Sequence, residues 1–172
     1  MLTLTLLRHA KSSWDDPSLS DIDRPLNGRG RAAAPVMGAL MRREGLRPDH
    51  VLCSPSARTR QTLDLVRAEL KKLGPAELRE SLYHATPVTL LRAIHGAPET
   101  ARHLLLVGHN PGLQQLAVWL TGGGPAAKRR GLAEKLPTGS LVVLTFEVTR
   151  WLDVKPGSGH LRLFARPREL VA

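Results

Sequence analysis

The chain alternates short runs of β-forming apolar residues with longer segments whose apolar residues recur every three or four positions. Runs of the first kind are typical of strands and those of the second kind of amphipathic helices, so the alternation predicts an α/β fold. We expect a mostly parallel sheet with helices on both faces and a C-terminal antiparallel strand pair. The expected strands are Leu2–Leu7, Asp49–Cys53, Glu77–Leu82, His103–Val107, Ser140–Val148 and Gly159–Phe164, and the expected helices are Arg29–Glu44, Pro55–Leu73, Thr86–His95 and Leu113–Leu120.

A length of 172 residues suits one domain with one core, so we expect a single domain over residues 1–172. The glycines and basic residues of segment 122–138 predict a loop. The longest apolar runs are far shorter than the ~20 residues that span a bilayer, which argues against a membrane protein. The single cysteine, Cys53, cannot form an internal disulfide, and no basic leader precedes the apolar run Leu2–Leu7. These features predict a cytoplasmic protein.

The formal net charge is +10, which favours anionic partners such as phosphorylated molecules, nucleic acid or acidic proteins. The basic residues are scattered along the chain, with Lys128–Arg130 as a short run. Two Phe, three Trp and one Tyr are too few for an obvious base-stacking platform. The charge alone does not choose among these partners, but the few aromatic residues make nucleic acid less expected than a phosphorylated protein or a small phosphorylated substrate.

Polar residues follow three of the predicted strands at the point where each strand ends. They are Arg8 and His9, then Ser54 with Arg58 four residues on, and finally His109. Ligands of open α/β sheets bind outside the carboxyl ends of the strands, so these side chains converge if their strands are parallel neighbours. Two arginines and two histidines without a carboxylate predict a phosphate site, because guanidinium groups bind phosphate oxygens in pairs.

The same residues carry a resemblance to a known family. Leu7-Arg8-His9-Ala10 resembles the first motif of the histidine phosphatase (phosphoglycerate mutase-like) superfamily, and Ser54-Pro55-x-x-Arg58 and Gly108-His109 resemble its second and third motifs, in the same order. The stretch Arg8–Trp14, followed by Asp23–Gly30, is similar to the short, SixA-like branch of phosphohistidine phosphatases. The resemblance covers roughly residues 2–121.

This resemblance implies a phosphoglycerate mutase-like three-layer sandwich and a phosphatase that needs no metal or other cofactor. It implies that His9 is the nucleophile and forms a phosphohistidine intermediate. Arg8, Arg58 and His109 are implied to clamp the phosphate, and Arg24 matches a further phosphate-binding arginine of the short branch. Nearby arginines should lower the pKa of His9 from its reference value of ~6.5, because they disfavour the imidazolium cation.

The acid that would protonate a leaving group is less clear in the sequence. Larger family members supply a carboxylic acid between the second and third motifs, where Glu80 is the best candidate and His84 the second. An imidazole leaving group depends less on protonation by an acid than an alkoxide does. The lack of a clearly placed acid therefore favours phosphohistidine on a protein as the substrate. A small phosphomonoester is the alternative substrate.

Two other functions are compatible with parts of the sequence. A cysteine-based phosphatase needs an arginine six positions after the cysteine, and that position from Cys53 is Thr59. The second alternative is a module that binds phosphate or nucleic acid without turnover, which the net charge of +10 permits. Phosphatase activity without added metal would separate an enzyme from such a module.

Overall fold

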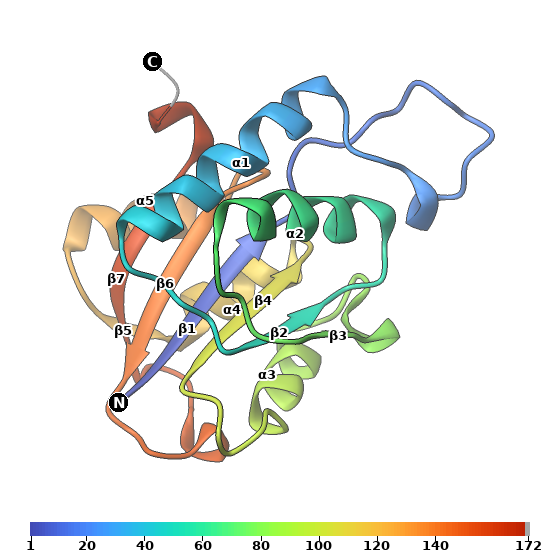
Figure 1. Ribbon diagram of the computed structural model, residues 1–172. Coiled ribbons are helices and arrows are strands. Elements are labelled where there is room, and N and C mark those ends of the chain that lie inside the picture. The colour runs from blue at the N-terminus through green and yellow to red at the C-terminus, as the bar shows by residue number, and fades with distance from the viewer. Residues whose placement is uncertain (171–172) are drawn as a thin grey trace.

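The computed structural model describes residues 1–170 and shows one seven-stranded sheet with the strand order β3-β2-β4-β1-β6-β7-β5 (Figure 1). The pairs β1–β4, β2–β4, β2–β3 and β5–β7 are parallel, whereas β1–β6 and β6–β7 are antiparallel. The predicted mixed sheet and its C-terminal antiparallel pair are therefore confirmed. The strands are β1 (Leu2–Arg8), β2 (His50–Cys53), β3 (Ala76–Leu78), β4 (His103–Gly108), β5 (Thr121–Gly123), β6 (Leu141–Phe146) and β7 (Gly159–Ala165).

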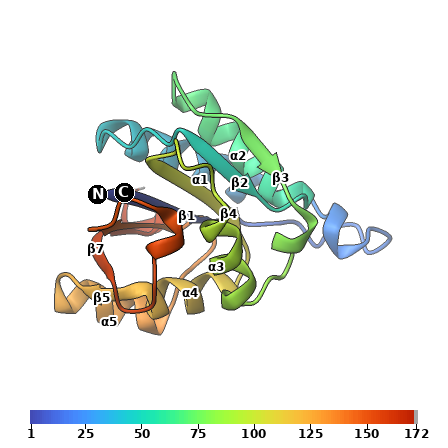
Figure 2. The same ribbon diagram turned by 90° about the horizontal axis from the view of Figure 1, so that it is seen from below.

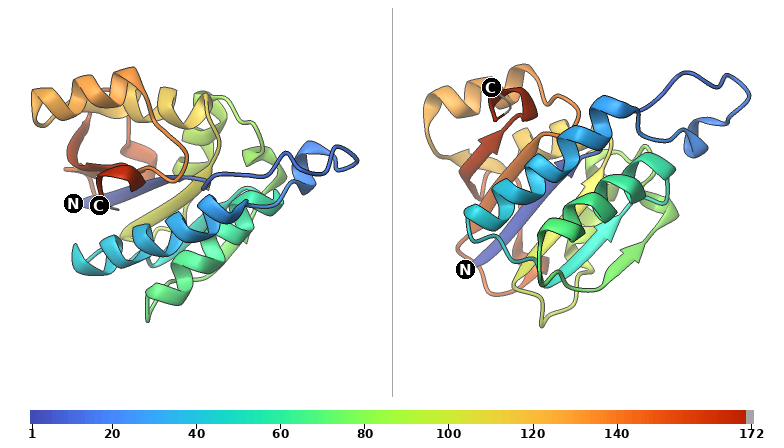
Figure 3. Two further views of the ribbon diagram at one scale, coloured as in Figure 1. Left: turned by 90° about the horizontal axis from the view of Figure 1, so that it is seen from above. Right: turned by 45° about the horizontal axis from the view of Figure 1, so that its top comes forward.

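Helices cover both faces of the sheet and make three layers (Figures 2 and 3). One face carries α1 (Gly28–Arg43) and α2 (Ala57–Glu69), and the other carries α3 (Pro87–His95), α4 (Gly112–Leu120) and α5 (Ala126–Glu134). Each interface buries its own apolar cluster. The sheet is buried on both sides, which explains the dense Leu and Val runs of β1, β4 and β6.

Side chains of β1 pack into the apolar clusters on both faces of the sheet. Leu4 and Leu6 belong to the cluster under α3 and α4, whereas Leu7 belongs to the cluster under α1 and α2. The register pairs Arg8 of β1 with Gly108 of β4. The residues that follow these strands, His9 and His109, therefore leave the sheet at the same edge.

Three local expectations were wrong. Segment 122–138 is not a loop, because it contains the end of β5 and all of α5. Leu132 is the one buried residue of α5, so the helix has almost no apolar stripe to reveal it. Helix α2 begins at Ala57 instead of Pro55, since the hydroxyl of Ser56 accepts from Thr59 N and caps it. Strand β3 ends at Leu78, and a 3₁₀ turn (Glu80–Leu82) follows it.

The long polar connection after β1 leaves the sheet and returns to it. It projects beyond the end of the sheet and is drawn in blue at the upper right of Figure 1. A short bridge between Ser12 and Leu26 closes its base, and a 3₁₀ turn (Asp21–Asp23) lies inside it. The connection therefore carries polar residues over the carboxyl end of β1. In residues 1–170 no helix is both long and apolar enough to cross a membrane.

Candidate active site

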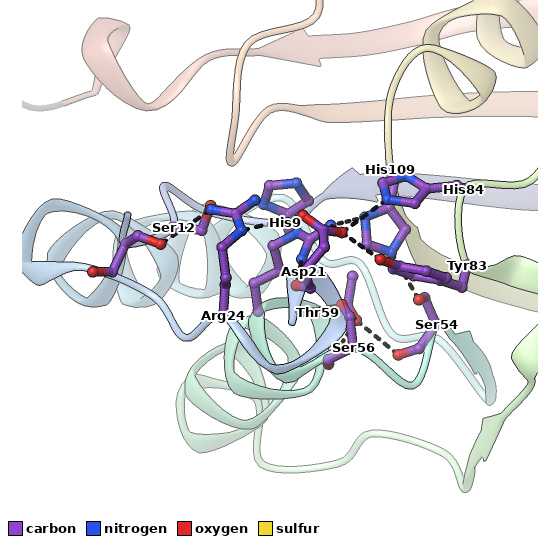
Figure 4. A network of polar contacts seen from close by, with 12 residues as sticks. His9, Ser12, Asp21, Arg24, Ser54, Ser56, Thr59, Tyr83, His84 and His109 are labelled. Atoms are coloured by element: carbon purple, nitrogen blue, oxygen red, sulfur yellow. Dashed lines mark hydrogen bonds and ion pairs between the residues drawn. The ribbon is translucent and has the colours of Figure 1, made fainter. Parts of the chain in front are cut away.

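Six residues singled out in the sequence line one hollow at the carboxyl ends of β1, β2 and β4. Backbone bonds hold these strand ends together, since His9 N donates to the carbonyl of Gly108 and Ser54 N to that of Val107, each at 3.1 Å. The strands are parallel neighbours, which is the condition for their convergence. The six residues are Arg8, His9, Arg24, Arg58, His84 and His109. Figure 4 labels four of them, which are His9, Arg24, His84 and His109.

The imidazole of His9 is held in one orientation by its own backbone. Its Nδ1 lies 2.7 Å from the carbonyl oxygen of Ala10. A carbonyl oxygen can only accept, so Nδ1 carries the proton and Nε2 carries the free lone pair. This orienting partner could not be found from the sequence, because nothing in a residue's identity shows where its carbonyl points.

His9 is also kept neutral. It is 7% exposed, and burial is the largest cause that lowers its pKa, to about 3. The bond to Ala10 opposes this shift, and the positive charges of Arg58, Arg8 and Arg24 add to it. The sequence predicted the direction of the pKa shift correctly, but it pointed to the arginines as the main cause. The imidazole of His9 is therefore uncharged at neutral pH and its Nε2 is unprotonated, as a nucleophile must be.

Three guanidinium groups surround the hollow. Arg58, in the first turn of α2, is 2% exposed, and its Nε–H has no hydrogen-bond partner in the described structure. The Nε–H of Arg8 likewise has none, although its Nη1 donates to the carbonyl of Leu136 at 2.9 Å. Arg24 is buried and donates to Ser12 Oγ at 3.0 Å. Three guanidinium groups around one hollow suit an anionic ligand.

His109 contacts groups on both sides of its ring. Its Nδ1 lies 3.4 Å from Nη2 of Arg58, which can only donate, so Nδ1 accepts and Nε2–H donates to Ser54 Oγ at 2.7 Å. Burial is the largest cause that lowers the pKa of His109, to about 3, and the positive charge of Arg58 adds to it. Its ring centroid is 5.3 Å from that of His9. The two histidines thus face one hollow as neutral rings.

Sequence reasoning missed Asp21, which the polar connection brings to the basic groups (Figure 4). Its carboxylate accepts from Arg24 Nε at 3.1 Å and from Arg58 Nη2 at 2.9 Å. It also contacts His84 Nε2 at 2.9 Å and the hydroxyl of Tyr83. Partial burial raises the pKa of Asp21, but hydrogen bonds from Tyr83, His84 and Arg58 outweigh it and hold the pKa well below the usual range. The one sequence signal was its place three residues before Arg24.

The two candidates for the acid are placed very differently. Glu80 is exposed in the 3₁₀ turn after β3 and is not among the residues that line the hollow, so the structure does not bring it together with the other predicted site residues. The turn ends the extended run that would have carried Glu80 to the sheet edge. His84 lines the hollow instead, with its ring centroid 5.0 Å from that of His109.

Trp14 also lines the hollow. It is 72% exposed, and its ring lies 3.5 Å from Cζ of Arg24. This stacked contact links two parts of the polar connection to each other. Within residues 1–170 no cluster of three or more His, Cys, Asp or Glu side chains is arranged to hold a metal ion.

Comparisons with known proteins identify the family of this chain. A profile of the histidine phosphatase superfamily (branch 1) matches residues 4–84. An uncharacterized protein of Mycobacterium tuberculosis is 38% identical over 94% of this chain and 100% of its own length. A structure from Nakamurella multipartitia, named as a phosphohistidine phosphatase SixA, has a TM-score of 0.83 and 28% identity over 99% of this chain and 97% of that chain.

A second structure, of the protein histidine phosphatase SixA complexed with tungstate, has a TM-score of 0.78 over 98% of this chain and 99% of that chain, and its 21% identity supports the fold alone. The matched profile contains the Arg8-His9 motif and extends past Arg58 to His84. The matched profile and the similar structures give the same assignment. The chain belongs to the histidine phosphatase superfamily, branch 1.

Proposed function

We propose that this chain is a phosphatase in which His9 takes the phosphoryl group, and that its substrate is phosphohistidine on a protein. One observation carries the proposal: the Nδ1 proton of His9 is held by Ala10, which leaves a neutral Nε2 in a hollow lined by guanidinium groups. A neutral nitrogen beside fixed cations is what attack on a phosphate dianion requires.

In the first step, Nε2 of His9 attacks phosphorus and the bond to the leaving nitrogen breaks. The electron pair of that bond goes to the leaving imidazole. A phosphohistidine already protonated on its other ring nitrogen then leaves as a neutral imidazole, so no acid is needed. Arg8, Arg24 and Arg58 neutralise the phosphoryl oxygens and hold them for in-line attack.

In the second step, water attacks the phosphoryl group on His9. The P–N bond breaks and its electron pair returns to Nε2, while both water hydrogens leave with the product as dihydrogen phosphate. Nδ1 keeps its proton throughout, since Ala10 still accepts it. His9 therefore ends as the same neutral tautomer from which it began.

A phosphate ester makes a different demand, because an alkoxide must receive a proton as it leaves. His84, with Asp21 as its partner at 2.9 Å, is the group in the hollow that fits this task, and Glu80 is not. We expect kcat/KM to be highest for phosphohistidine peptides, lower for aryl phosphates and lowest for alkyl phosphates. Glu80→Gln should leave all three values unchanged, which makes it a control for His84→Gln.

The decisive experiment is to trap a radiolabelled phosphoryl group on the protein. An acid-labile, base-stable label that is absent from His9→Ala would support His9 as the nucleophile. An acid-stable label, or one that survives in His9→Ala, would refute it. If alkyl esters prove the best substrates, the chain acts on small phosphomonoesters instead, and a complete lack of turnover would favour a binding module.

A further inference from the structure

A second hollow adjoins the active site. We call it the basic hollow, after the four cationic side chains that line it, which are Lys11, Arg29, Arg166 and Arg168. Lys11 and Thr138 line both hollows, so the two share a wall. No acidic side chain lines the basic hollow among the residues that the structure describes. A ligand that fills the active site thus has a strongly positive neighbour.

Close packing at the start of α1 builds this hollow. A side chain at Gly30 would collide with the backbone of Lys11, so the glycine lets the first turn of α1 lie against Lys11. Asn27 N donates to the carbonyl of Lys11 at 3.0 Å and fixes the same contact. The C-terminal 3₁₀ turn (Pro167–Glu169) lies beside α1 and supplies Arg168, and Arg166 comes directly before the turn (Figure 1). Three distant segments therefore bring their cations together.

Most of this positive charge is not neutralised. Arg166 pairs with Glu169 at 2.6 Å. Lys11, Arg29 and Arg168 form no ion pair within residues 1–170. Arg29 also lies in the first turn of α1, which holds no acidic residue, although the helix dipole disfavours a cation there. Unpaired cations that line a hollow are available to an external anion.

We infer that the basic hollow binds a carboxylate side chain that flanks the phosphorylated residue of a protein substrate; this inference rests on the proposed function. Guanidinium groups pair with carboxylates through two parallel hydrogen bonds. Residues of an extended peptide follow one another at about 3.3 Å, so an acidic residue within a few positions of the phosphohistidine reaches across the shared wall. The hollow would then select phosphoproteins with acidic flanks.

The test compares two phosphohistidine peptides, one with glutamates and one with glutamines at the flanking positions. Wild-type protein should show a kcat/KM about tenfold higher for the acidic peptide, as two partly exposed ion pairs allow. Arg29→Glu with Arg168→Glu should abolish or reverse this preference and leave kcat for an aryl phosphate unchanged. Both arginines are exposed, and a glutamate suits the start of α1, so the variant should fold.

The matched control is Arg43→Glu with Arg130→Glu, which changes the net charge equally at exposed positions outside both hollows. This control should keep the preference. Equal kcat/KM for both peptides, or a preference that survives in the Arg29 and Arg168 variant, would overturn the inference. The inference would also be overturned if the Arg29 and Arg168 substitutions affected only the hydrolysis of small bisphosphates and not that of the peptides.

A second readout separates this inference from the proposed function. Binding of the two peptides to His9→Ala protein, which cannot turn them over, should show the same preference and the same loss with the Arg29 and Arg168 substitutions. If peptides bind with this preference but wild-type protein never hydrolyses them, the proposed function fails while the basic hollow stands. If wild-type protein hydrolyses both peptides without preference, the proposed function stands while the inference about the basic hollow fails.

Discussion

Asp21 occupies donors that a phosphate would need, so replacing it should strengthen the binding of inorganic phosphate. Arg58 donates from Nη1 to the main-chain oxygen of Asp21 at 2.6 Å and from Nη2 to its carboxylate at 2.9 Å. Asp21→Asn removes the carboxylate charge at nearly constant shape. Phosphate then competes with a neutral amide for Nη2 of Arg58.

The size of the effect follows from that one contact. A hydrogen bond to a charged group contributes about 1.5–3 kcal/mol. The Asp21 side chain is 41% exposed, so solvent weakens the contact and we take about 1.4 kcal/mol, near the lower limit. This corresponds to a roughly tenfold lower inhibition constant for phosphate. The free protein should also be less stable, because the buried charge of Arg58 loses its partner.

The assay measures inhibition of aryl phosphate hydrolysis by phosphate at neutral pH, together with thermal unfolding with and without phosphate. Asp23→Asn is the control, since Asp23 is exposed in the same turn and does not line the hollow. Phosphate should raise the unfolding temperature of Asp21→Asn more than that of wild type or of the control. Equal or weaker phosphate binding by Asp21→Asn would refute the competition between Asp21 and phosphate.

Four further outcomes follow from the site. His9→Ala should lose turnover but retain the fold and phosphate binding, which activity and calorimetry would check. Arg58→Ala should lower kcat/KM more than Arg24→Ala, and Arg58→Lys should recover only part of the loss, because an ammonium group lacks the forked geometry. The pKa values of His9 and His109 are lowered from 6.5 to about 3, so below pH 6.5 the unfolded chain binds protons that the native protein does not bind. The free energy of unfolding, measured by urea titration, should therefore decrease as the pH is lowered from about 6.5 to 3. Chelators should leave activity intact and vanadate should inhibit, and loss of activity with a chelator that a divalent metal restores would contradict this mechanism.

The site could be predicted from the sequence where a physical rule links a residue's position in the chain to its location in the fold. Carboxyl ends of parallel strands meet at one edge, so the convergence of Arg8, His9 and His109 could be predicted from the order of strands along the chain. Arg58 could be predicted in the same way because it lies in the first turn of the helix after β2. Asp21 could not be found this way, since it lies in a polar connection with no periodic pattern and its contacts depend on how that connection folds back.

Errors in the helices have equally local causes. Helix α5 has one buried side chain, Leu132, so its sequence lacks the apolar stripe by which helices are recognised. Ser54 and Ser56 are both possible caps beside Pro55, and residue type alone could not separate them. In the structure Ser56 caps α2, and the hydroxyl of Ser54 is left for His109. Which of the two serines caps α2 thus decides which one is free to contact His109.

The neutral state of His9 depends on the fold more than on its charged neighbours. Burial is the largest cause of its lowered pKa, and Arg58, Arg8 and Arg24 each add less. Losing one arginine would therefore leave His9 unprotonated at neutral pH and would weaken only the grip on phosphate. Binding of the anion and readiness of the nucleophile are in this way supplied separately, the first by guanidinium groups and the second by the carboxyl edge of the buried sheet. This separation explains how the polar connection can place the negative charge of Asp21 among the arginines without returning His9 to an ordinary pKa.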